Sequence, residues 1–170
     1  MKVDYVNPFL EAAQEVLAAE ADVHVAHGPL SLQRTALTTD EITVILSIVG
    51  QVQGVVLYSL SEATALALVG RIMAQEFSQF DNLAQSGIAE LGNVITGRAG
   101  VKLAEAGFVT TISPPSLVHG RGVSISTLDF PRVVVPLTSE AGTLAVHLAL
   151  RETKGAGAAP VALNAEVMAK

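Results

Sequence analysis

The chain contains no cysteine and no tryptophan, and only 4% of its 170 residues are aromatic. The absence of cysteine excludes a disulfide framework, a thiolate nucleophile and a cysteine-based zinc site. Charged residues make up 15% of the chain and hydrophobic residues 50%, a balance that excludes an intrinsically disordered protein. The formal net charge of −6 argues against nucleic-acid binding, because cationic side chains supply most of that affinity.

Long hydrophobic runs are also missing. A membrane-spanning helix needs about 20 consecutive apolar residues, whereas the best runs here, Ile42–Val49 and Val55–Leu57, have the length of strands. The N-terminal segment carries one lysine and then Asp4 and Glu11, so it lacks the basic and apolar regions of a secretory signal. We therefore expect a cytoplasmic protein that makes no membrane contact.

Three helices are predicted, each from the N-cap residue that precedes it. They span residues 8–20 after Asn7, about 62–76 after Ser61, and about 82–105 after Asp81. Pro8 suits the first helical position, because no hydrogen-bond donor is lost there. Gly107 is expected to end the third helix.

The other hydrophobic segments are rich in β-branched residues and predict strands. These are a weak strand at Leu30–Leu37, a hairpin of Ile42–Val49 and Gly54–Leu60, and strands at Val123–Leu128, Arg132–Thr138 and Thr143–Arg151. Gly107–Gly120 should be extended or looped, and Pro136 places its strand at an edge or a bend. The order favours an α+β fold, an antiparallel sheet with helices packed on one face. Residues 1–152 would form this domain, and residues 153–170, rich in Gly and Ala, a C-terminal extension.

The helix predicted over residues 82–105 has two different sides. Spacing of about 100° per residue places its larger apolar residues on one side, which we expect to face the core: Leu83, Ala84, Ile88, Leu91, Val94, Ile95 and Ala99. The opposite side carries a stripe of short residues: Ser86, Glu90, Asn93 and Gly97, flanked by Ala89, Thr96 and Gly100.

This helix also contains four glycines, each of which costs about 1 kcal/mol of helix stability relative to alanine. Gly87 and Gly92 lie at the borders of the apolar side, where glycine lets another element approach closely. Gly97 and Gly100 lie on the polar side, where they would leave a flat surface. A flat surface suits the docking of a macromolecule, whereas small-molecule sites are concave.

Glu90 and Asn93 stand one helical turn apart. A carboxamide can hold a water molecule through its donor and its acceptor, and a carboxylate can pair with a cation on a partner. The pair would therefore suit orienting a water against a group that is already activated, such as a phosphoryl group. From spacing alone, the stripe is more simply interpreted as the solvated face of an amphipathic helix.

No other motif carries comparable chemistry. His24 and His27 are three residues apart, but they fall in a predicted loop without a third ligand, which favours a surface segment over a metal site. His119 is interpreted as an ordinary loop residue, and His147 is given no role. Phosphate-binding glycine motifs are absent from the sequence.

The segment SGIAELGN at Ser86–Asn93, followed by VITGRAG, resembles the signature helix of the CheC/CheX/FliY family of chemotaxis phosphatases. That family carries Asp or Ser, then Glu, then Asn, at the positions of Ser86, Glu90 and Asn93. A proline segment follows, in which either Pro114 or Pro115 could be the family's proline. The opening MKVDYVNPFLEA is also similar to that of CheX proteins, so the resemblance covers about residues 1–150.

Within this family the sequence is most similar to CheX, which has one site, because the helix over residues 8–20 does not repeat the motif. Glu11 is followed at the motif spacing by Gln14, and Glu15 by Ala18, instead of asparagine. A single site with a CheC/CheX-like fold is therefore expected.

The resemblance implies a phosphatase that hydrolyses the aspartyl phosphate of a CheY-like response regulator. Asn93 would orient the attacking water, and Glu90 would pair with the receiver's active-site lysine. The other residues expected to contact the receiver are Ser86, Gly97, Pro114 and Pro115. The receiver would bring its own Mg²⁺, so no cofactor or metal is expected on this chain.

The resemblance also implies a homodimer formed through sheet edges. An alternative function remains open, a non-catalytic receiver-binding or scaffold module of a two-component or flagellar-switch pathway.

Overall fold

The structure is a computed structural model that describes residues 3–128 and 130–153. In chain order its elements are α1 (Val3–Ala21), β1 (Ala26–His27), β2 (Ser31–Gln33), β3 (Leu37–Thr38), β4 (Ile42–Gly50), β5 (Val52–Leu60), α2 (Glu62–Met73), α3 (Asn82–Glu105), β6 (Thr110–Ile112), β7 (Ser116–His119), β8 (Ser124–Ile125), β9 (Arg132–Ser139) and β10 (Gly142–Glu152). The predicted α+β class is confirmed.

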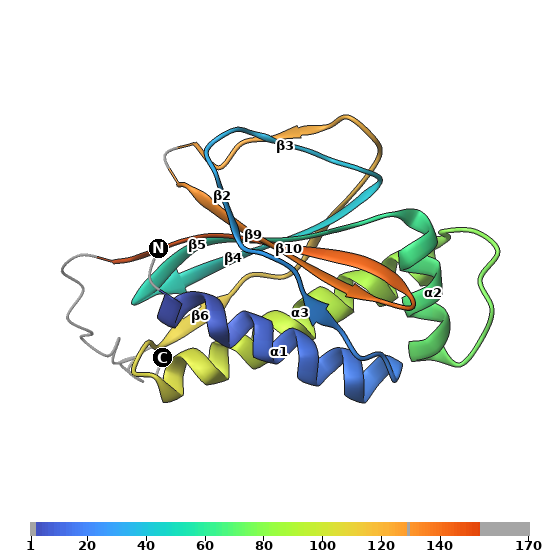
Figure 1. Ribbon diagram of the computed structural model, residues 1–170, viewed down its shortest axis with the longest axis horizontal. Helices are drawn as coiled ribbons and strands as arrows, with labels where there is room; N and C mark the ends of the chain where they lie inside the picture. The colour runs from blue at the N-terminus through green and yellow to red at the C-terminus, as the bar shows by residue number, and fades with distance from the viewer. Residues whose placement is uncertain (1–2, 129, 154–170) are drawn as a thin grey trace, which may run out of the picture.

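One antiparallel sheet organises the molecule, in the order β1-β9-β10-β5-β4-β6, with β2 also on β9 and β7 also on β4. Helices α1 and α3 lie along one face of this sheet and α2 lies near one end, as Figure 1 shows. Alternate residues of each long strand point to these helices. In β4 these are Ile42, Val44, Leu46 and Ile48, all 2% exposed or less. The prediction of helices on one face is confirmed.

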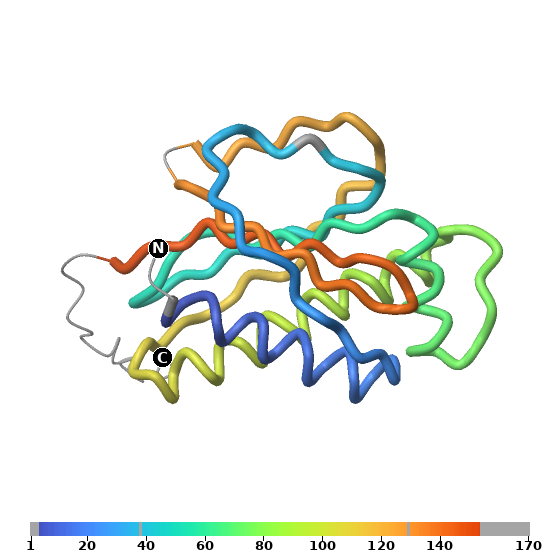
Figure 2. The backbone as a smooth tube through the Cα atoms, viewed as in Figure 1, coloured from blue at the N-terminus to red at the C-terminus, as the bar shows by residue number. Residues whose placement is uncertain are grey.

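On the other face of the sheet, two distant segments run together. We call them the arm, defined as residues 30–40 and 120–128; Figure 2 shows both above the sheet. β3 and β8 pair within it, with Leu37 opposite Ile125. Thr39 adds a hydrogen bond from its hydroxyl to the Gly120 carbonyl oxygen at 2.7 Å. The predicted strands at Leu30–Leu37 and Val123–Leu128 are wrong in extent: each reduces to two- or three-residue strands.

The first helix begins earlier than predicted. α1 includes Val3, and Pro8 lies inside it, not at its first position, so Asn7 is not the N-cap. Pro8 removes one intrahelical donor. The turn before it is nevertheless held by tertiary packing, because Tyr5 and Val6 are 2% and 3% exposed. Burial of these two side chains outweighs the local helix-start signal.

The predicted hairpin of β4 and β5 is confirmed, with a shorter connection. β5 already begins at Val52, which is fully buried, so only Gln51 separates the two strands. β9 is not an edge strand, because β1 and β2 both pair with its outer side. These two strands are separated beside Pro136, whose carbonyl oxygen accepts from the Gly28 backbone N–H at 2.8 Å. The proline therefore divides the neighbouring strand in two.

Helix α3 spans residues 82–105 as predicted, and the Asp81 carboxylate accepts from the Ala84 backbone N–H at 2.9 Å. α2 has its predicted N-cap, Ser61, but ends at Met73, three residues early, because Ala74 adopts a left-handed conformation. The predicted domain boundary falls beside Thr153, whose hydroxyl still donates to the Gly50 carbonyl oxygen at 2.6 Å. Residues 154–170, the rest of the predicted extension, lie outside the described residues.

Candidate functional site

The predicted buried side of α3 is confirmed for Ala84, Ile88, Leu91, Ile95 and Ala99, but not for its margins. Leu83 and Val94 are 51% and 37% exposed, so placing them in the core was wrong. The helix also buries small residues, among them Thr96 and the two glycines predicted at the borders of this side, Gly87 and Gly92. At Gly87 the helix approaches Val69 of α2 and at Gly92 it approaches Val44 of the sheet, and such close approach favours glycine over leucine. A prediction weighted by side-chain hydrophobicity therefore finds the centre of the buried arc but misplaces its margins.

Gly92 lies where α3 closely approaches the sheet. A Cβ atom there would lie 2.9 Å from Val44 Cγ1 and 3.2 Å from Tyr58 Cδ2. One turn further along, the Thr96 hydroxyl donates to the Gly92 carbonyl oxygen at 2.7 Å and is 2.9 Å from the Tyr58 hydroxyl. Burial raises the pKa of Tyr58, which therefore stays neutral. These contacts hold the turn of α3 that carries Asn93 against β5.

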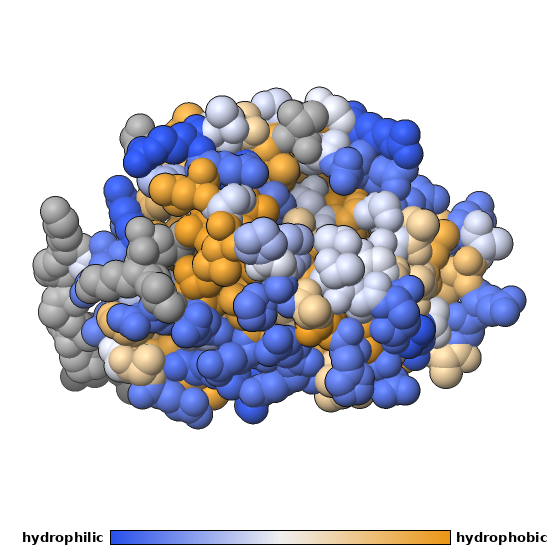
Figure 3. All heavy atoms as spheres, viewed as in Figure 1, coloured by the Kyte–Doolittle hydropathy of each residue, from blue (hydrophilic) through white to orange (hydrophobic). Residues whose placement is uncertain are grey.

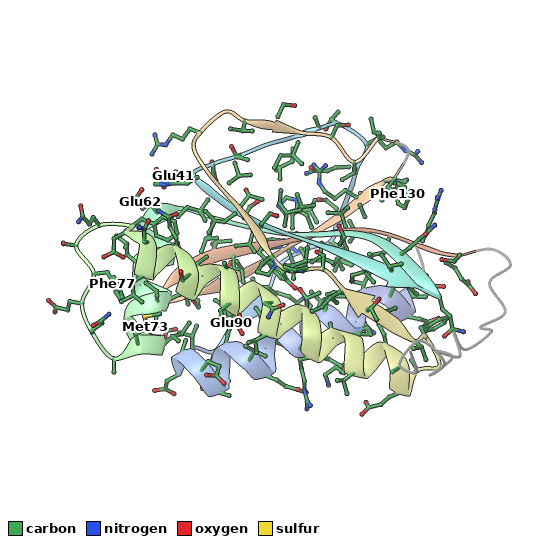
Figure 4. The ribbon with its side chains drawn as sticks, turned by 180° about the vertical axis from the view of Figure 1, so that it is seen from behind. Glu41, Glu62, Met73, Phe77, Glu90 and Phe130 are labelled. Atoms are coloured by element: carbon green, nitrogen blue, oxygen red, sulfur yellow. The ribbon has the colours of Figure 1, made fainter. Side chains whose placement is uncertain are left out.

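The side of this turn away from the sheet presents the predicted pair. Glu90 is exposed and Asn93 is half-buried, and Figure 4 labels Glu90 midway along α3. The Asn93 Nδ2 atom donates to Glu90 Oε2 at 3.3 Å. A carboxylate can only accept, so this contact directs the amide nitrogen toward Glu90. No other described residue bonds to the Asn93 side chain, so one N–H and the carbonyl oxygen are left to a water molecule as far as this part of the chain is concerned.

Glu90 has no cationic partner within the described part of the chain. The two cations further along α3 are both bound to α1: Arg98 Nε lies 2.8 Å from Glu15 Oε2, and Lys102 Nζ lies 2.7 Å from Glu15 Oε1. Hydrogen bonds from Lys102 and Arg98 hold the pKa of Glu15 below its usual value. Lys102 Nζ is also 3.2 Å from Glu11 Oε2. The Glu90 carboxylate therefore carries no ion pair within residues 3–128 and 130–153.

The remaining predicted contact residues surround this pair unevenly. Ser86 is exposed, and its hydroxyl donates to the Asn82 carbonyl oxygen at 2.9 Å. Gly97 is half-buried, and a Cβ there would meet only Ile112 Cδ1 of β6, at 3.9 Å. Gly97 therefore lies at the border between α3 and the sheet edge, with room for a side chain.

Pro114 and Pro115 connect β6 to β7, the two strands that pack beside α3. Pro114 is exposed and Pro115 half-buried. Ser113 fixes this segment to β4, since its backbone N–H donates to the Ser47 carbonyl oxygen and its hydroxyl accepts from the Ser47 N–H, both at 2.9 Å. The structure thus places the proline segment between two strands that pack beside α3. Contact of these prolines with a receiver stays a prediction.

The histidines lie apart from this pair. His24 and His27 are exposed beyond the end of α1, and His119 Nε2 is 3.2 Å from Glu62 Oε2 on α2. Within residues 3–128 and 130–153, no group of three or more His, Asp or Glu side chains is arranged to hold a metal ion. No helix of that part of the chain is both long and apolar enough to cross a membrane.

Comparison with known proteins places the chain in a family. The profile of the family described as chemotaxis phosphatase CheX matches residues 42–138. The chain is 30% identical, over 128 residues, to the CheY-P phosphatase CheX of Thermotoga maritima, which covers 75% of this chain and 83% of the relative. The chain therefore belongs to the CheX family of chemotaxis phosphatases, as the resemblance of its α3 motif implied.

Solved structures agree with this assignment. A CheC-like superfamily protein from Shewanella shares the fold, with a TM-score of 0.81 at 24% identity, over 89% of this chain and 99% of that one. CheX of Borrelia burgdorferi, solved as a CheX–CheY–BeF₃–Mg²⁺ complex, has a TM-score of 0.77 at 28% identity. This second match covers 89% of this chain and all of the other. The predicted CheC/CheX-like fold is confirmed.

Two buried polar groups are not predicted from the sequence. The helical spacing puts Thr96 beside the polar stripe, yet it is fully buried against Tyr58. His147 has no role in the sequence analysis, yet it is 4% exposed and accepts a hydrogen bond from Arg132. Side chains along β10 alternate between the two faces of the sheet, and this could have shown on which face His147 lies. It could not have shown that the arm helps to cover this face.

Proposed function

We propose that this protein dephosphorylates the aspartyl phosphate of a CheY-like receiver, with Asn93 and Glu90 as the catalytic pair. The observation that carries the proposal is the pairing on α3 of an exposed carboxylate with a half-buried carboxamide, 3.3 Å apart and without an intramolecular cation among the described residues. Family membership supports it, because the Thermotoga relative is a CheY-P phosphatase and the Borrelia CheX was solved with CheY.

The chemistry requires little from this chain. Water attacks the phosphorus atom, the bond from phosphorus to the aspartyl oxygen breaks, and the receiver regains its carboxylate while inorganic phosphate and a proton leave. Asn93 would hold the water in line through its free N–H and its carbonyl oxygen. Glu90 would pair with the receiver's lysine, and its contact with Asn93 presets the amide orientation. Mg²⁺ would come with the receiver.

The proposal includes a homodimer formed through a sheet edge. Apolar side chains are exposed beside β9 and on the arm: Leu30 (52%), Leu32 (58%), Val123 (41%) and Leu128 (85%). Figure 3 shows hydrophobic atoms gathered in the middle of this face, between the arm above and the hydrophilic surface of α1 below. Such exposed patches mark interfaces more often than free surface. The cytoplasmic location expected from the sequence is also part of the proposal, because enzyme and receiver must share a compartment.

The test follows the decay of a phosphorylated CheY-like receiver with Mg²⁺, with and without the full chain. Asn93→Ala should lower kcat by about 100-fold, because the water loses its orienting group. Glu90→Gln should mainly raise KM, by about tenfold, because an intermolecular charge pair is lost.

Helix α1 offers a matched control. Gln14 is an exposed carboxamide one turn after Glu11, so it repeats the side-chain chemistry of the pair outside α3. Gln14→Ala should leave the rate unchanged, in line with a single site. An Asn93→Ala variant that folds and is as active as wild type would refute the mechanism.

The scaffold alternative predicts that the chain binds the receiver but does not accelerate its dephosphorylation. With a receiver carrying beryllofluoride in place of the phosphoryl group, a pure binding module and a phosphatase would both show saturable binding. Only the phosphatase also accelerates dephosphorylation of the native receiver. Tight binding with no acceleration by the wild-type chain would therefore favour the scaffold.

A further inference from the structure

Large apolar side chains are exposed on the same line of α3 that carries Glu90. Leu83 is 51% and Val94 37% exposed, although the opposite side of this helix is packed on the sheet. At about 100° per residue, Leu83, Glu90 and Val94 fall within about 40° of one another around the helix axis. Side chains of a helix lean toward its N-terminus, so Val94 covers the surface next to Glu90. The Glu90 carboxylate therefore lies between two apolar side chains along one line of α3.

Helix α2 adds a third apolar group beside this line. A Cβ atom on Gly87 would lie 2.8 Å from Met73 Cε. Gly87 is one turn after Leu83 and one turn before Glu90, so the Met73 methyl group packs against the turn of α3 that separates them. Met73 is half-buried, and in Figure 4 it lies with Glu90 on the side of the sheet away from the arm. We call Met73, Leu83 and Val94 the apolar collar.

The collar surrounds a charge that has no counter-charge in the described part of the chain. The Asn93 amide, which bonds to Glu90 at 3.3 Å, is neutral. A partner that brings a cation to Glu90 would also cover the collar, because Leu83 and Val94 are two turns and one turn away, within about 11 Å along the helix. Apolar neighbours that exclude water from an ion pair strengthen it, because the local dielectric constant falls.

We propose that the apolar collar sets the affinity for the CheY-like receiver, by excluding water from the ion pair between Glu90 and the receiver's lysine. The inference rests on the proposed function, which brings Glu90 and Asn93 to the receiver's active site. It adds residues outside the motif of Ser86, Glu90 and Asn93 to those that determine receiver binding.

The structure favours a receiver over a second copy of this chain as the partner that covers the collar. The apolar residues that suit a homodimer all belong to the arm, across the sheet from α3: Leu30, Leu32, Val123 and Leu128. A dimer formed through them leaves the collar exposed. The collar is instead continuous with the catalytic pair, which the receiver has to reach.

The test measures the Kd of the full chain for a CheY-like receiver loaded with beryllofluoride and Mg²⁺, and the KM for the same receiver when phosphorylated. Val94→Thr keeps the size and branching of the side chain. It should raise both constants about tenfold, because a methyl group leaves the interface and a hydroxyl is placed where water is excluded. Leu83→Asn should act in the same direction. Val109→Thr, at a 65% exposed position between α3 and β6, is the matched control and should change neither constant.

A double-mutant cycle distinguishes action through Glu90 from simple contact area. In a Glu90→Gln background there is no charge for the collar to protect, so Val94→Thr should raise Kd no more than about threefold. An equal, tenfold effect in both backgrounds would show that Val94 acts by contact alone and would overturn the proposed role. Circular dichroism of each variant checks that it is folded.

The possible outcomes separate the collar from the proposed function. If the wild-type chain binds the receiver but does not dephosphorylate it, the phosphatase proposal is refuted, and a weakened Val94→Thr still supports the collar. If the wild type binds and dephosphorylates the receiver while Val94→Thr and Leu83→Asn match Val109→Thr, the collar alone is refuted. Absence of receiver binding would refute both. A lower mass of free Leu83→Asn in light scattering would show that a second copy covers the collar, which also refutes it.

Discussion

Replacing Gly92 of α3 by alanine should destabilise the protein, although alanine is the better helix former. The gain in helix propensity is about 1 kcal/mol. The new Cβ would lie 2.9 Å from Val44 Cγ1, and Val44 is 1% exposed and β-branched, so it cannot rotate away easily. Overpacking of this kind costs about 1–3 kcal/mol. The net expectation is a loss of about 1 kcal/mol.

Gly97→Ala, further along the same helix, provides the matched comparison. Its Cβ would meet only Ile112 Cδ1, at 3.9 Å, an ordinary contact. The propensity gain should therefore survive, and the variant should be about 1 kcal/mol more stable than wild type.

Urea unfolding of both variants and of wild type, followed by circular dichroism, measures these differences. The two variants should be separated by about 2 kcal/mol, or roughly 4–8 °C in Tm for a chain of this size. If Gly92→Ala proves as stable as Gly97→Ala, the close approach of α3 to β4 does not explain the glycine at position 92.

Three further predictions concern the buried polar groups and the exposed sheet edge. Thr96→Val should cost about 1–3 kcal/mol in urea unfolding, because the buried Tyr58 hydroxyl loses its partner, and adding Tyr58→Phe should recover part of this loss. Because the pKa of His147 is about 4 when folded and 6.5 otherwise, the unfolded chain binds an extra proton between these values. The His147 contribution to stability should therefore fall by on the order of 3 kcal/mol as pH drops from 6.5 to 4; unfolding curves across this range should lose that slope in His147→Phe. Leu32→Asp, at a 58% exposed position of β2, should turn a homodimer into a monomer by light scattering, whereas an unchanged mass would place the interface elsewhere.

Local sequence chemistry determined the elements that carry the candidate site. Asp81 as N-cap and the run of helix-forming residues after it were enough to give the bounds of α3, because N-capping and periodicity act within a few residues. The spacing of Glu90 and Asn93 then places both on one helix face, because the helical repeat alone sets that geometry. The long hairpin of β4 and β5 followed in the same way from β-branched runs.

Tertiary structure decided where the buried arc of that helix ends and what the sheet's other face carries. Leu83 and Val94 are exposed and Gly92 is buried because backbone approach to Val44 and Tyr58, not side-chain hydrophobicity, sets the orientation of α3. Pro8 stays inside a helix because Tyr5 and Val6 are buried by the rest of the fold. The pairing of Leu37 with Ile125 joins residues far apart in the chain. Such contacts depend on the closure of long loops, on which local propensity and periodicity carry no information.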